Sequence, residues 1–321
     1  MKDISIVIVN LNGAEFISSC LESIEMKYVK EIIVVDNASI DSSVKVIEDF
    51  SKDVIIIKNT QNLGFAGPAN QGGFAAGGEF ILFLNNDVRI QPGTLKGLRD
   101  AMSDTNVAVV GPLLLSNDGL FLNAGSFLTR TGFLHHLTEH EAHLLKDSEH
   151  RFAVQGACML VRKKCFEEIG GFDSEFFAYF EESDLCWRLN SIGYATVCKI
   201  DLTAVHDGGR TSSKIFTSDY LDFLSFRNRF RSIDRNLSGY SRIYVMTSYC
   251  ICSLIFSTLY LLRGKIRNCF SIIKALLTYR NNYNINQART IKRKFSYYQK
   301  LTAKPNVKQG IKSVTHYVET R

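Results

Sequence analysis

The stretch ISIVIVNLNG at residues 4–13 decides the fold class. Its first six residues are almost all apolar, and short polar residues and a glycine follow at once. A run of this kind predicts a strand that is buried on both faces, which is typical of parallel sheets. The next such run, EIIVVDNAS at residues 31–39, also passes from apolar residues into short polar side chains.

The same alternation continues to residue 112. Further apolar runs predict strands at 54–57, 80–84 and 107–110. Between the strands, apolar residues at helical spacing and recognisable start and stop residues predict four helices: 14–26, one capped by Ser42, one from Pro68 to Gly77, and one opened by Pro92. Strands that alternate with helices predict an α/β fold, a Rossmann-like, mostly parallel sheet flanked by helices.

Residues 113–215 follow a less regular pattern. Short apolar runs near 127–133 and 153–161 predict an antiparallel or mixed extension of the sheet, and a helix is expected to begin near Glu182. Five histidines gather in a polar stretch that we interpret as a surface loop. A metal site there is the less favoured alternative because their spacing is irregular: His135, His136, His140, His143 and His150.

The end of the chain differs in charge from the rest. The net charge is +6, yet residues 263–321 hold fourteen Lys/Arg and one acid, a balance of +13, which leaves −7 for residues 1–262. An acidic body with a basic end indicates two kinds of partner. We therefore predict a nucleotide-binding α/β domain over residues 1–215 and a helical, basic C-terminal region over residues 216–321.

Residues 243–262 carry no charge at all and are bounded by arginines. Twenty helical residues reach about 30 Å, the thickness of the hydrocarbon core of a bilayer. A buried helix and a membrane-spanning or in-plane helix remain open alternatives, since serines and threonines dilute the hydrophobicity. The basic segment that follows, with Lys292-Arg293-Lys294, suits anionic lipid headgroups. Nucleic acid ranks lower as a partner because no nucleic-acid-binding motif accompanies the charge.

The overall composition is that of a cytosolic globular protein. It is 45% hydrophobic and 22% charged, which excludes wholesale disorder. The eight cysteines are scattered through apolar stretches with no CxxC pair, and no apolar run near Met1 is long enough for a signal peptide. We expect reduced, mostly buried thiols and a cytoplasmic location.

Polar residues follow each predicted strand at the sheet edge where ligands bind in open parallel sheets. Asp36 ends the second strand and is placed to bind a base or a ribose hydroxyl. The alternative is a turn or cap role, which Ser39, Asp41 or Ser42 could equally fill. The chain contains neither GxGxxG nor GxxxxGK[ST], which argues against a dinucleotide fold and a P-loop ATPase.

Asn85 and Asp87 follow the fourth strand and lie two residues apart, on the same side of the chain. A carboxylate with an amide oxygen suits a hard cation such as Mg²⁺ or Mn²⁺ that bridges a diphosphate, although this sequence is also common in turns. His206 precedes an Asp-Gly-Gly sequence and could complete the ligand set, although a lone histidine is more often structural.

The densest signal is an acidic cluster formed by Glu181, Glu182 and Asp184. Four aromatic residues precede it, and the chain's single tryptophan, Trp187, follows. Mutual repulsion and partial burial are expected to raise the pKa of at least one carboxyl group toward the range of a general base. Arg188 lies one helical turn after Asp184 and is expected to pair with it.

Six motifs, in order, resemble those of family 2 glycosyltransferases, and most closely the rhamnosyltransferase-like members that build bacterial surface polysaccharides. The resemblance covers about residues 4–210 and leaves the C-terminal third without a specific motif. Its motifs are residues 5–13, 35–39, 62–70, 84–88, 171–173 and 181–188.

The resemblance implies a GT-A fold and an inverting, metal-dependent transfer from a nucleotide-diphospho-sugar. It implies that Asp36 binds the base, that Asn85 and Asp87 occupy the Asp-x-Asp position, and that His206 is the late metal ligand. Glu182 matches the catalytic base, with Glu181 and Asp184 as alternatives. We expect the donor to contact eight residues: Asn10, Asp36, Asn62, Gly64, Asn85, Asn86, Trp187 and Arg188.

The resemblance favours dTDP-rhamnose as donor, with UDP-hexoses close behind, and a glycan or lipid-linked acceptor. The expected location is then the inner face of the cell membrane. One alternative function is a catalytically idle sugar-nucleotide-binding scaffold. Another is a nucleotidyltransferase, which would need basic residues in the first loop, where the sequence has none.

Overall fold

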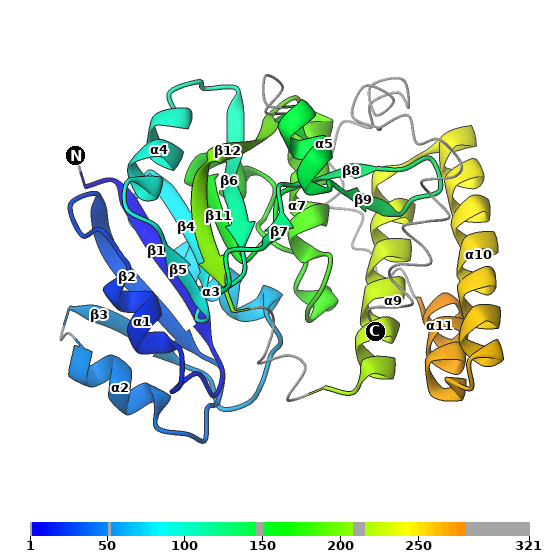
Figure 1. Ribbon diagram of the computed structural model, residues 1–321, viewed down its shortest axis with the longest axis horizontal. Helices are drawn as coiled ribbons and strands as arrows, with labels where there is room; N and C mark the ends of the chain where they lie inside the picture. The colour runs from blue at the N-terminus through cyan, green and yellow to red at the C-terminus, as the bar shows by residue number, and fades with distance from the viewer. Residues whose placement is uncertain (1, 51–52, 146–149, 208–215, 280–321) are drawn as a thin grey trace.

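The computed structural model describes residues 2–50, 53–145, 150–207 and 216–279, and its centre is a ten-stranded sheet (Figure 1). The main strand order is β10-β12-β6-β11-β4-β1-β2-β3, with β5 paired to β12 and β7 to β6. The strands are β1 (Ile4–Asn10), β2 (Val29–Asp36), β3 (Val54–Lys58), β4 (Phe80–Asn85), β5 (Val88–Ile90), β6 (Val107–Leu115), β7 (Phe121–Asn123), β10 (His150–Arg151), β11 (Cys158–Arg162) and β12 (Ala195–His206).

The five strands predicted in the first 112 residues are all present, as β1, β2, β3, β4 and β6. β1 lies between β2 and β4 and is parallel to both. Its register pairs Asn10 with Asp36 and Val9 with Asn85. The polar residues that follow these strands therefore meet at one edge of the sheet, as the sequence pattern predicts.

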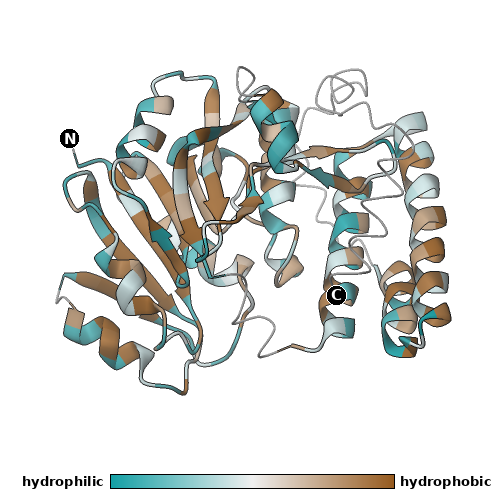
Figure 2. Ribbon diagram, in the orientation of Figure 1, coloured by the Kyte–Doolittle hydropathy of each residue, from teal (hydrophilic) through white to brown (hydrophobic). Residues whose placement is uncertain are grey.

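Helices cover both faces of the sheet, whose central strands are strongly hydrophobic (Figure 2). Ile4, Ile6 and Ile8 of β1 pack with α1, α2 and α4 on one face, while Val7 packs with α3, α6 and α7 on the other. The helices are α1 (Ile17–Glu22), α2 (Ser43–Phe50), α3 (Ala66–Ala75), α4 (Thr94–Ala101), α5 (Glu139–Leu144), α6 (Lys163–Glu168), α7 (Glu181–Ile192), α9 (Ser218–Asn236), α10 (Gly239–Leu262) and α11 (Ile266–Thr278).

The middle of the chain differs from the expected extension of the sheet. β11 lies inside the sheet, antiparallel between β4 and β6, and β8 (Ser126–Leu128) pairs with β9 (Leu134–His136) in a separate two-stranded sheet. The pattern also failed to predict β12, because this strand mixes buried residues with half-exposed ones and breaks its register with β6 between Lys199 and Thr203.

The predicted histidine loop is largely ordered secondary structure. His135 and His136 lie on β9, and His140 and His143 lie on α5. Thr138 and Glu141 form a capping box at the start of α5, a local arrangement that the sequence analysis overlooked. Within the part of the chain that the structure describes, no group of three or more His, Cys, Asp or Glu side chains is arranged to hold a metal ion.

The C-terminal helices extend the apolar cluster of the sheet without interruption. Side chains of α9, α10 and α11 belong to the same buried cluster as α3, α6 and α7. The boundary predicted at residues 215 and 216 adjoins residues 208–215, which lie outside the described residues. All eight cysteines are free, and six are buried.

Candidate active site

A chain of hydrogen bonds crosses the sheet at the ends of β2, β1 and β4. Asn10 is fully buried, and its Nδ2 donates to Asp36 Oδ1 at 3.0 Å, while its Oδ1 accepts from Asn86 Nδ2 at 2.9 Å. Nδ2 of Asn10 also donates to Ser43 Oγ at 2.9 Å. The predicted base-binding residue and the residue before Asp87 are thus parts of one network.

Gly13 allows this network to close. A Cβ atom at residue 13 would lie 2.2 Å from Asn86 Nδ2 and 2.4 Å from Asn10 Oδ1. Such distances are far inside van der Waals contact, so any side chain here would displace one of the two amides. The glycine in the opening motif is therefore explained by close packing.

Asp36 is 4% exposed, and each of its carboxylate oxygens accepts one hydrogen bond: Oδ1 from Asn10 and Oδ2 from the Ser39 amide at 3.1 Å. Asp41 fills the turn role before α2, since its Oδ1 accepts from the Ser43 amide at 3.0 Å. Asp36 therefore accepts one turn hydrogen bond, from the Ser39 amide, and keeps acceptor capacity on each oxygen that a ligand could use.

The loop between β3 and α3 is shaped by Asn37, which is 1% exposed. Its Nδ2 donates to Asn62 Oδ1 and to the Gly64 carbonyl, both at 2.8 Å, and its Oδ1 accepts from the Leu63 amide. Asn62 Oδ1 also accepts from the Gly64 amide. The Asn62 oxygen is therefore used within the loop, and Asn62 acts there by fixing the backbone.

Gly64 connects this loop to the segment that leads into α7. It has φ of +77°, and a Cβ atom there would lie 2.2 Å from the Phe177 carbonyl oxygen. The same carbonyl accepts hydrogen bonds from the Phe65 and Ala66 amides at the start of α3. The 62–70 motif thus shares a backbone contact with the segment that precedes α7, far away in sequence.

Asp87 and His206 lie together because β12 runs antiparallel to β5. Asp87 is 5% exposed, and its Oδ1 lies 3.3 Å from His206 Nε2. That nitrogen is buried and makes no hydrogen bond with any residue that the structure describes. A carboxylate beside a buried, unsatisfied imidazole nitrogen fits a divalent cation such as Mn²⁺ or Mg²⁺, whose further ligands would be diphosphate and water oxygens.

Glu182 lies next to the end of β4. A Cβ atom on Gly156 would lie 3.2 Å from Glu182 Cβ, and the neighbouring Ala157 carbonyl accepts from the Asn85 amide at 2.9 Å. Asn85 is half-buried at this strand end, two residues before Asp87. The predicted base therefore packs against the segment that pairs with the end of β4, the strand that leads into the Asp-x-Asp position.

Glu181 and Glu182 open α7 and have different surroundings. Burial, reinforced by the charge of Glu182, raises the pKa of Glu181 well above its usual value, and Glu181 Oε2 has no hydrogen-bond partner. Burial also raises the pKa of Glu182, although the Ser183 hydroxyl, which donates to Glu182 Oε1 at 2.9 Å, and Arg229 oppose this rise. Glu182 is the more exposed of the two, which suits a proton acceptor.

The raised pKa of Glu181 predicts a pH-dependent stability. The folded state holds the Glu181 proton more tightly than the unfolded state. Its stabilising contribution is therefore present below about pH 4.3, the ordinary pKa of a glutamate, and is lost as pH rises through the folded pKa. Glu181→Gln should remove this loss, so the free energy of unfolding should vary less with pH than in wild type. The difference should be about 1.4 kcal/mol for each unit by which folding raises the pKa of Glu181. Urea unfolding of both proteins across this pH range measures the difference. The same pH dependence in wild type and Glu181→Gln would contradict the raised pKa of Glu181.

Asp184 occupies a different environment from the two glutamates. It is fully buried, and its carboxylate binds Arg188 Nε at 2.7 Å, the Ser232 hydroxyl at 2.7 Å and Asn236 Nδ2 at 2.9 Å. Burial alone would raise its pKa, but Arg188 and Arg235 hold it below the usual value. The predicted pairing of Asp184 with Arg188 is confirmed, and the geometry indicates that Asp184 ties α7 to α9.

Trp187 and Arg188 do not lie at the sheet edge where donor contacts were expected. Trp187 is fully buried, with its ring edge-on to Phe152. Arg188 is 2% exposed, and its guanidinium donates to the Ile169 and Gly171 carbonyls as well as to Asp184. These positions indicate a packing role for both side chains. The sequence suggested donor contacts because both residues follow the acidic cluster closely along the chain.

The segment before α7 has an unusual backbone. Phe177, Tyr179 and Phe180 all have positive φ, between 63° and 73°, a region that non-glycine residues rarely adopt. Asn228 of α9 holds it, since its buried Nδ2 lies 2.8 Å from each of the Phe176, Ala178 and Tyr179 carbonyls. No motif in the sequence marks Asn228, and the one signal for it is that asparagine is a poor residue for the middle of a helix.

We predict that Asn228→Ala lowers kcat/KM by about 10- to 100-fold, because the carbonyls of this segment would lose the Asn228 amide and the segment that positions Glu182 would relax. Asn190→Ala is the matched control. Asn190 is also buried and donates to the Phe152 carbonyl, away from this segment. Steady-state kinetics and thermal melting of both variants separate the two effects. A parallel loss of stability without a difference in kcat/KM would rule out a positioning role for Asn228.

Comparisons with known proteins show the family to which the chain belongs. The model of the family "Glycosyl transferase family 2" matches residues 5–170. The low-salt glycan biosynthesis hexosyltransferase Agl10 of Haloferax volcanii is 31% identical over 257 residues, which cover 73% of this chain and 79% of that protein. The N-acetylglucosaminyl-diphospho-decaprenol L-rhamnosyltransferase of Mycobacterium tuberculosis is 26% identical over 212 residues, covering 57% and 68%.

The fold also matches a solved structure, that of the mannosyltransferase PcManGT from Pyrobaculum calidifontis in complex with GDP-Man and Mn²⁺. The TM-score is 0.56 at 14% identity, covering 86% of each chain. This likeness confirms the GT-A fold expected from the sequence motifs. Together, the family match and the hexosyltransferase relative establish that the chain belongs to glycosyl transferase family 2 and is a glycosyltransferase.

Proposed function

We propose that this glycosyltransferase moves a sugar, with inversion, from a nucleotide-diphospho-sugar to a hydroxyl of a glycan or lipid-linked acceptor, and that it needs Mn²⁺ or Mg²⁺. The observation that carries the proposal is the connection of three acids at one sheet edge. Asp36 reaches Asn86 through Asn10, and Glu182 packs beside the strand end that leads to Asp87.

In this proposal, residues at the ends of β1, β2 and β4 form the donor end of the site. Asp36 has acceptor capacity for a base N–H or a ribose hydroxyl, and it is held in place by Asn10 and Ser39. Asp87 and His206 would hold the cation, which when bound neutralises charge on the diphosphate as it leaves. A cation in the PcManGT complex supports this use of the corresponding fold.

The acceptor end is formed by Glu182. Its carboxylate would take the proton of the acceptor hydroxyl while that oxygen bonds to the anomeric carbon and the bond from this carbon to the diphosphate oxygen breaks. The raised pKa of Glu182 makes it a better proton acceptor than an ordinary glutamate. A base that activates the acceptor directly, with no covalent sugar–enzyme step, gives inversion.

We further propose that the enzyme works in surface polysaccharide synthesis, in the cytoplasm at the inner face of the membrane, with dTDP-rhamnose as favoured donor. The names of the similar hexosyltransferase and rhamnosyltransferase support a role in glycan assembly. In the division that we propose, residues 1–215 bind the donor and residues 216–321 complete and anchor the enzyme. The hydrogen bond from Asn228 of α9 to the Phe176 carbonyl supports the proposal that the second part holds the first in shape.

A panel of nucleotide sugars tests this function. Purified full-length protein is incubated with dTDP-rhamnose, UDP-hexoses and GDP-mannose, with Mn²⁺, Mg²⁺ or a chelator, and release of the nucleoside diphosphate is measured. We expect cation-dependent release, fastest with dTDP-rhamnose. No release with any donor would favour an idle scaffold, and release of pyrophosphate would favour a nucleotidyltransferase.

A further inference from the structure

One side of α10 is exposed and almost entirely apolar. Its inner side, with Tyr249, Phe256 and Tyr260, is buried in the protein. In Figure 1, α10 forms the edge of the described structure farthest from β3. The outer face of α10 is defined by apolar residues that recur at helical spacing and are 42–81% exposed, with the exposed Thr247 and Thr258 between them: Tyr240, Ile243, Tyr244, Ile251, Leu254, Ile255, Leu261 and Leu262.

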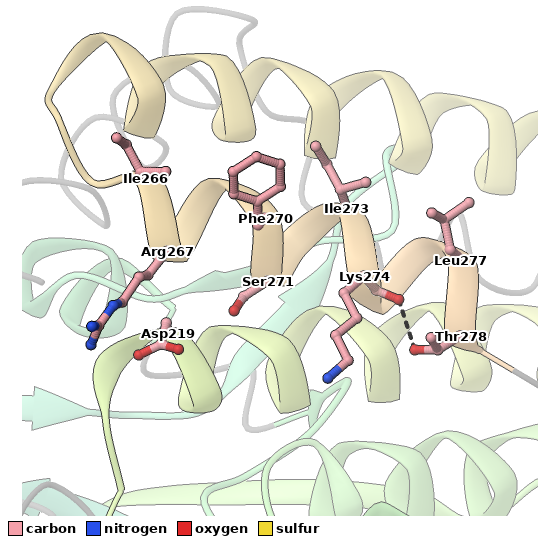
Figure 3. Close-up of a pocket in the computed structure, with 9 residues that line it drawn as sticks. All are labelled: Asp219, Ile266, Arg267, Phe270, Ser271, Ile273, Lys274, Leu277 and Thr278. Atoms are coloured by element: carbon pink, nitrogen blue, oxygen red, sulfur yellow. Dashed lines mark hydrogen bonds between the residues drawn. The ribbon is translucent and has the colours of Figure 1, made fainter.

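The apolar surface continues onto α11. Ile266, Phe270 and Leu277 are 54–79% exposed and line a shallow groove of about 520 Å³. Figure 3 shows these side chains along the α10 side of α11, while Arg267 and Lys274 lie on the side toward α9. The surface therefore combines an apolar strip with a basic margin, and Asp219 of α9 lies at the end near Arg267.

Basic residues outnumber acids in this region, where Asp219 of α9 is the one acid among the residues that line the groove. Residues 235–318 contain fifteen Lys/Arg and no Asp or Glu. On the described helices, Arg263, Arg267 and Lys274 are exposed beside the apolar strip. Exposed apolar side chains next to an uncompensated basic margin are the combination that binds to anionic bilayer surfaces.

We propose that the outer face of α10 and α11 docks in the plane of an anionic lipid bilayer, with the apolar side chains in the headgroup and upper acyl region. This proposal deepens the membrane location proposed above by assigning the surface. An in-plane position follows from packing, because the inner side of α10 is tied to α9 and α11. The Tyr249 hydroxyl donates to the Phe226 carbonyl at 3.1 Å, and the Ser257 hydroxyl donates to the Cys269 carbonyl at 3.1 Å.

A membrane-spanning position conflicts with these contacts. α10 is long and apolar enough to cross a bilayer, but one third of its most apolar stretch is buried within the protein. To cross, it would have to leave α9 and α11 and expose Ser253 and Ser257, which are now buried, to lipid. The structure therefore favours a helix that lies on the bilayer.

A second copy of the chain is the less favourable occupant. A symmetric dimer through this face would bring two basic margins together, which like-charge repulsion opposes. The residues after 279 do not neutralise the face either, since those up to 318 add nine Lys/Arg and no acid. Anionic lipid offers the opposite charge to all of them.

The test is sedimentation of full-length protein with vesicles of phosphatidylcholine alone or mixed with phosphatidylglycerol. We expect binding to the mixed vesicles that weakens at high salt. Leu254→Ser/Leu262→Ser should weaken it at least about 10-fold through lost apolar burial. Arg263→Gln/Arg267→Gln should weaken it roughly 10- to 30-fold, since each interfacial basic residue contributes about a factor of five.

Matched controls have the same substitutions elsewhere on the surface. Leu120→Ser/Leu144→Ser removes two leucines that are 64% and 69% exposed, and Lys45→Gln/Lys164→Gln removes two exposed lysines; both should bind vesicles like the wild type. The proposal is overturned if wild type ignores mixed vesicles, or if the test variants bind as the controls do. It is also overturned if alkaline carbonate fails to release the protein, which would mean a spanning helix, or if Leu254→Ser/Leu262→Ser dissociates a dimer without affecting vesicle binding.

Donor turnover separates this proposal from the proposed function. The surface variants lie outside the active site, so they should release nucleoside diphosphate from a soluble donor at the wild-type rate. Vesicle binding without donor turnover would refute only the function. Donor turnover without vesicle binding would refute only the docking surface.

Discussion

Glu182→Gln should lower the rate of sugar transfer by about 10²–10⁴-fold while leaving donor affinity unchanged. The amide keeps the size of the side chain but cannot accept the proton of the acceptor hydroxyl. Glu182 lies beside the strand end that leads to Asp87, and its raised pKa is the property expected of a general base. Single-turnover transfer assays give the rate, and calorimetric titration with the nucleotide sugar gives the affinity.

Glu181→Gln is the matched control, since it makes the same chemical change one residue away. Glu181 is 7% exposed, and its raised pKa favours the protonated state, so its amide should preserve most of the transfer activity. In wild type, the rate should fall on the acid side at a pH above the ordinary pKa of a glutamate, because the base must be deprotonated. If Glu182→Gln transfers sugar as fast as wild type, or if Glu181→Gln is the inactive variant, Glu182 is not the base.

Asp87→Asn should weaken donor binding in the presence of Mn²⁺ by at least about 10- to 100-fold. The substitution replaces the charged carboxylate that we propose as a metal ligand, buried beside His206 at the sheet edge, with a neutral amide. Mutation of residues that only support a metal ligand typically lowers metal affinity by about 10- to 100-fold. Loss of the charge on the proposed ligand itself should lower cation-dependent donor affinity by at least as much. Calorimetry with the nucleotide sugar, with and without Mn²⁺, measures the change.

The effect of Asp87→Asn should depend on the cation. In the presence of a chelator, wild type and Asp87→Asn should bind the donor equally weakly. Asp100→Asn, a change at an exposed surface carboxylate paired with Lys96, should behave as wild type in both conditions. An equal loss of affinity with and without Mn²⁺ would mean that Asp87 acts on the donor without a cation.

The sequence predicts the sheet, and the edge at which its polar residues gather, because both depend on local patterns. Unbroken apolar runs mark buried parallel strands, and strands in parallel register must end at the same edge. That rule alone brings Asn10, Asp36 and Asn85 together, as the register of β1 with β2 and β4 shows. The exact fit of Gly13 against Asn86 follows once these strands are placed.

Contacts between distant segments could not be read in the same way. Three acids within four residues look alike in sequence, but α9 supplies Ser232 and Asn236 to Asp184 alone. The positive φ values before α7 and their support by Asn228 depend on α9 as well. The sequence therefore could not show the partners of Asp184 or the support of the segment before α7, because α9 provides both.

The most direct test of the account is a crystal structure with Mn²⁺ and the nucleoside diphosphate that the donor panel selects. The account predicts an anomalous manganese peak at Asp87 and His206, the base or ribose against Asp36, and Glu182 facing the same bound molecule. A nucleotide bound away from Asp36, or manganese bound away from Asp87, would contradict it.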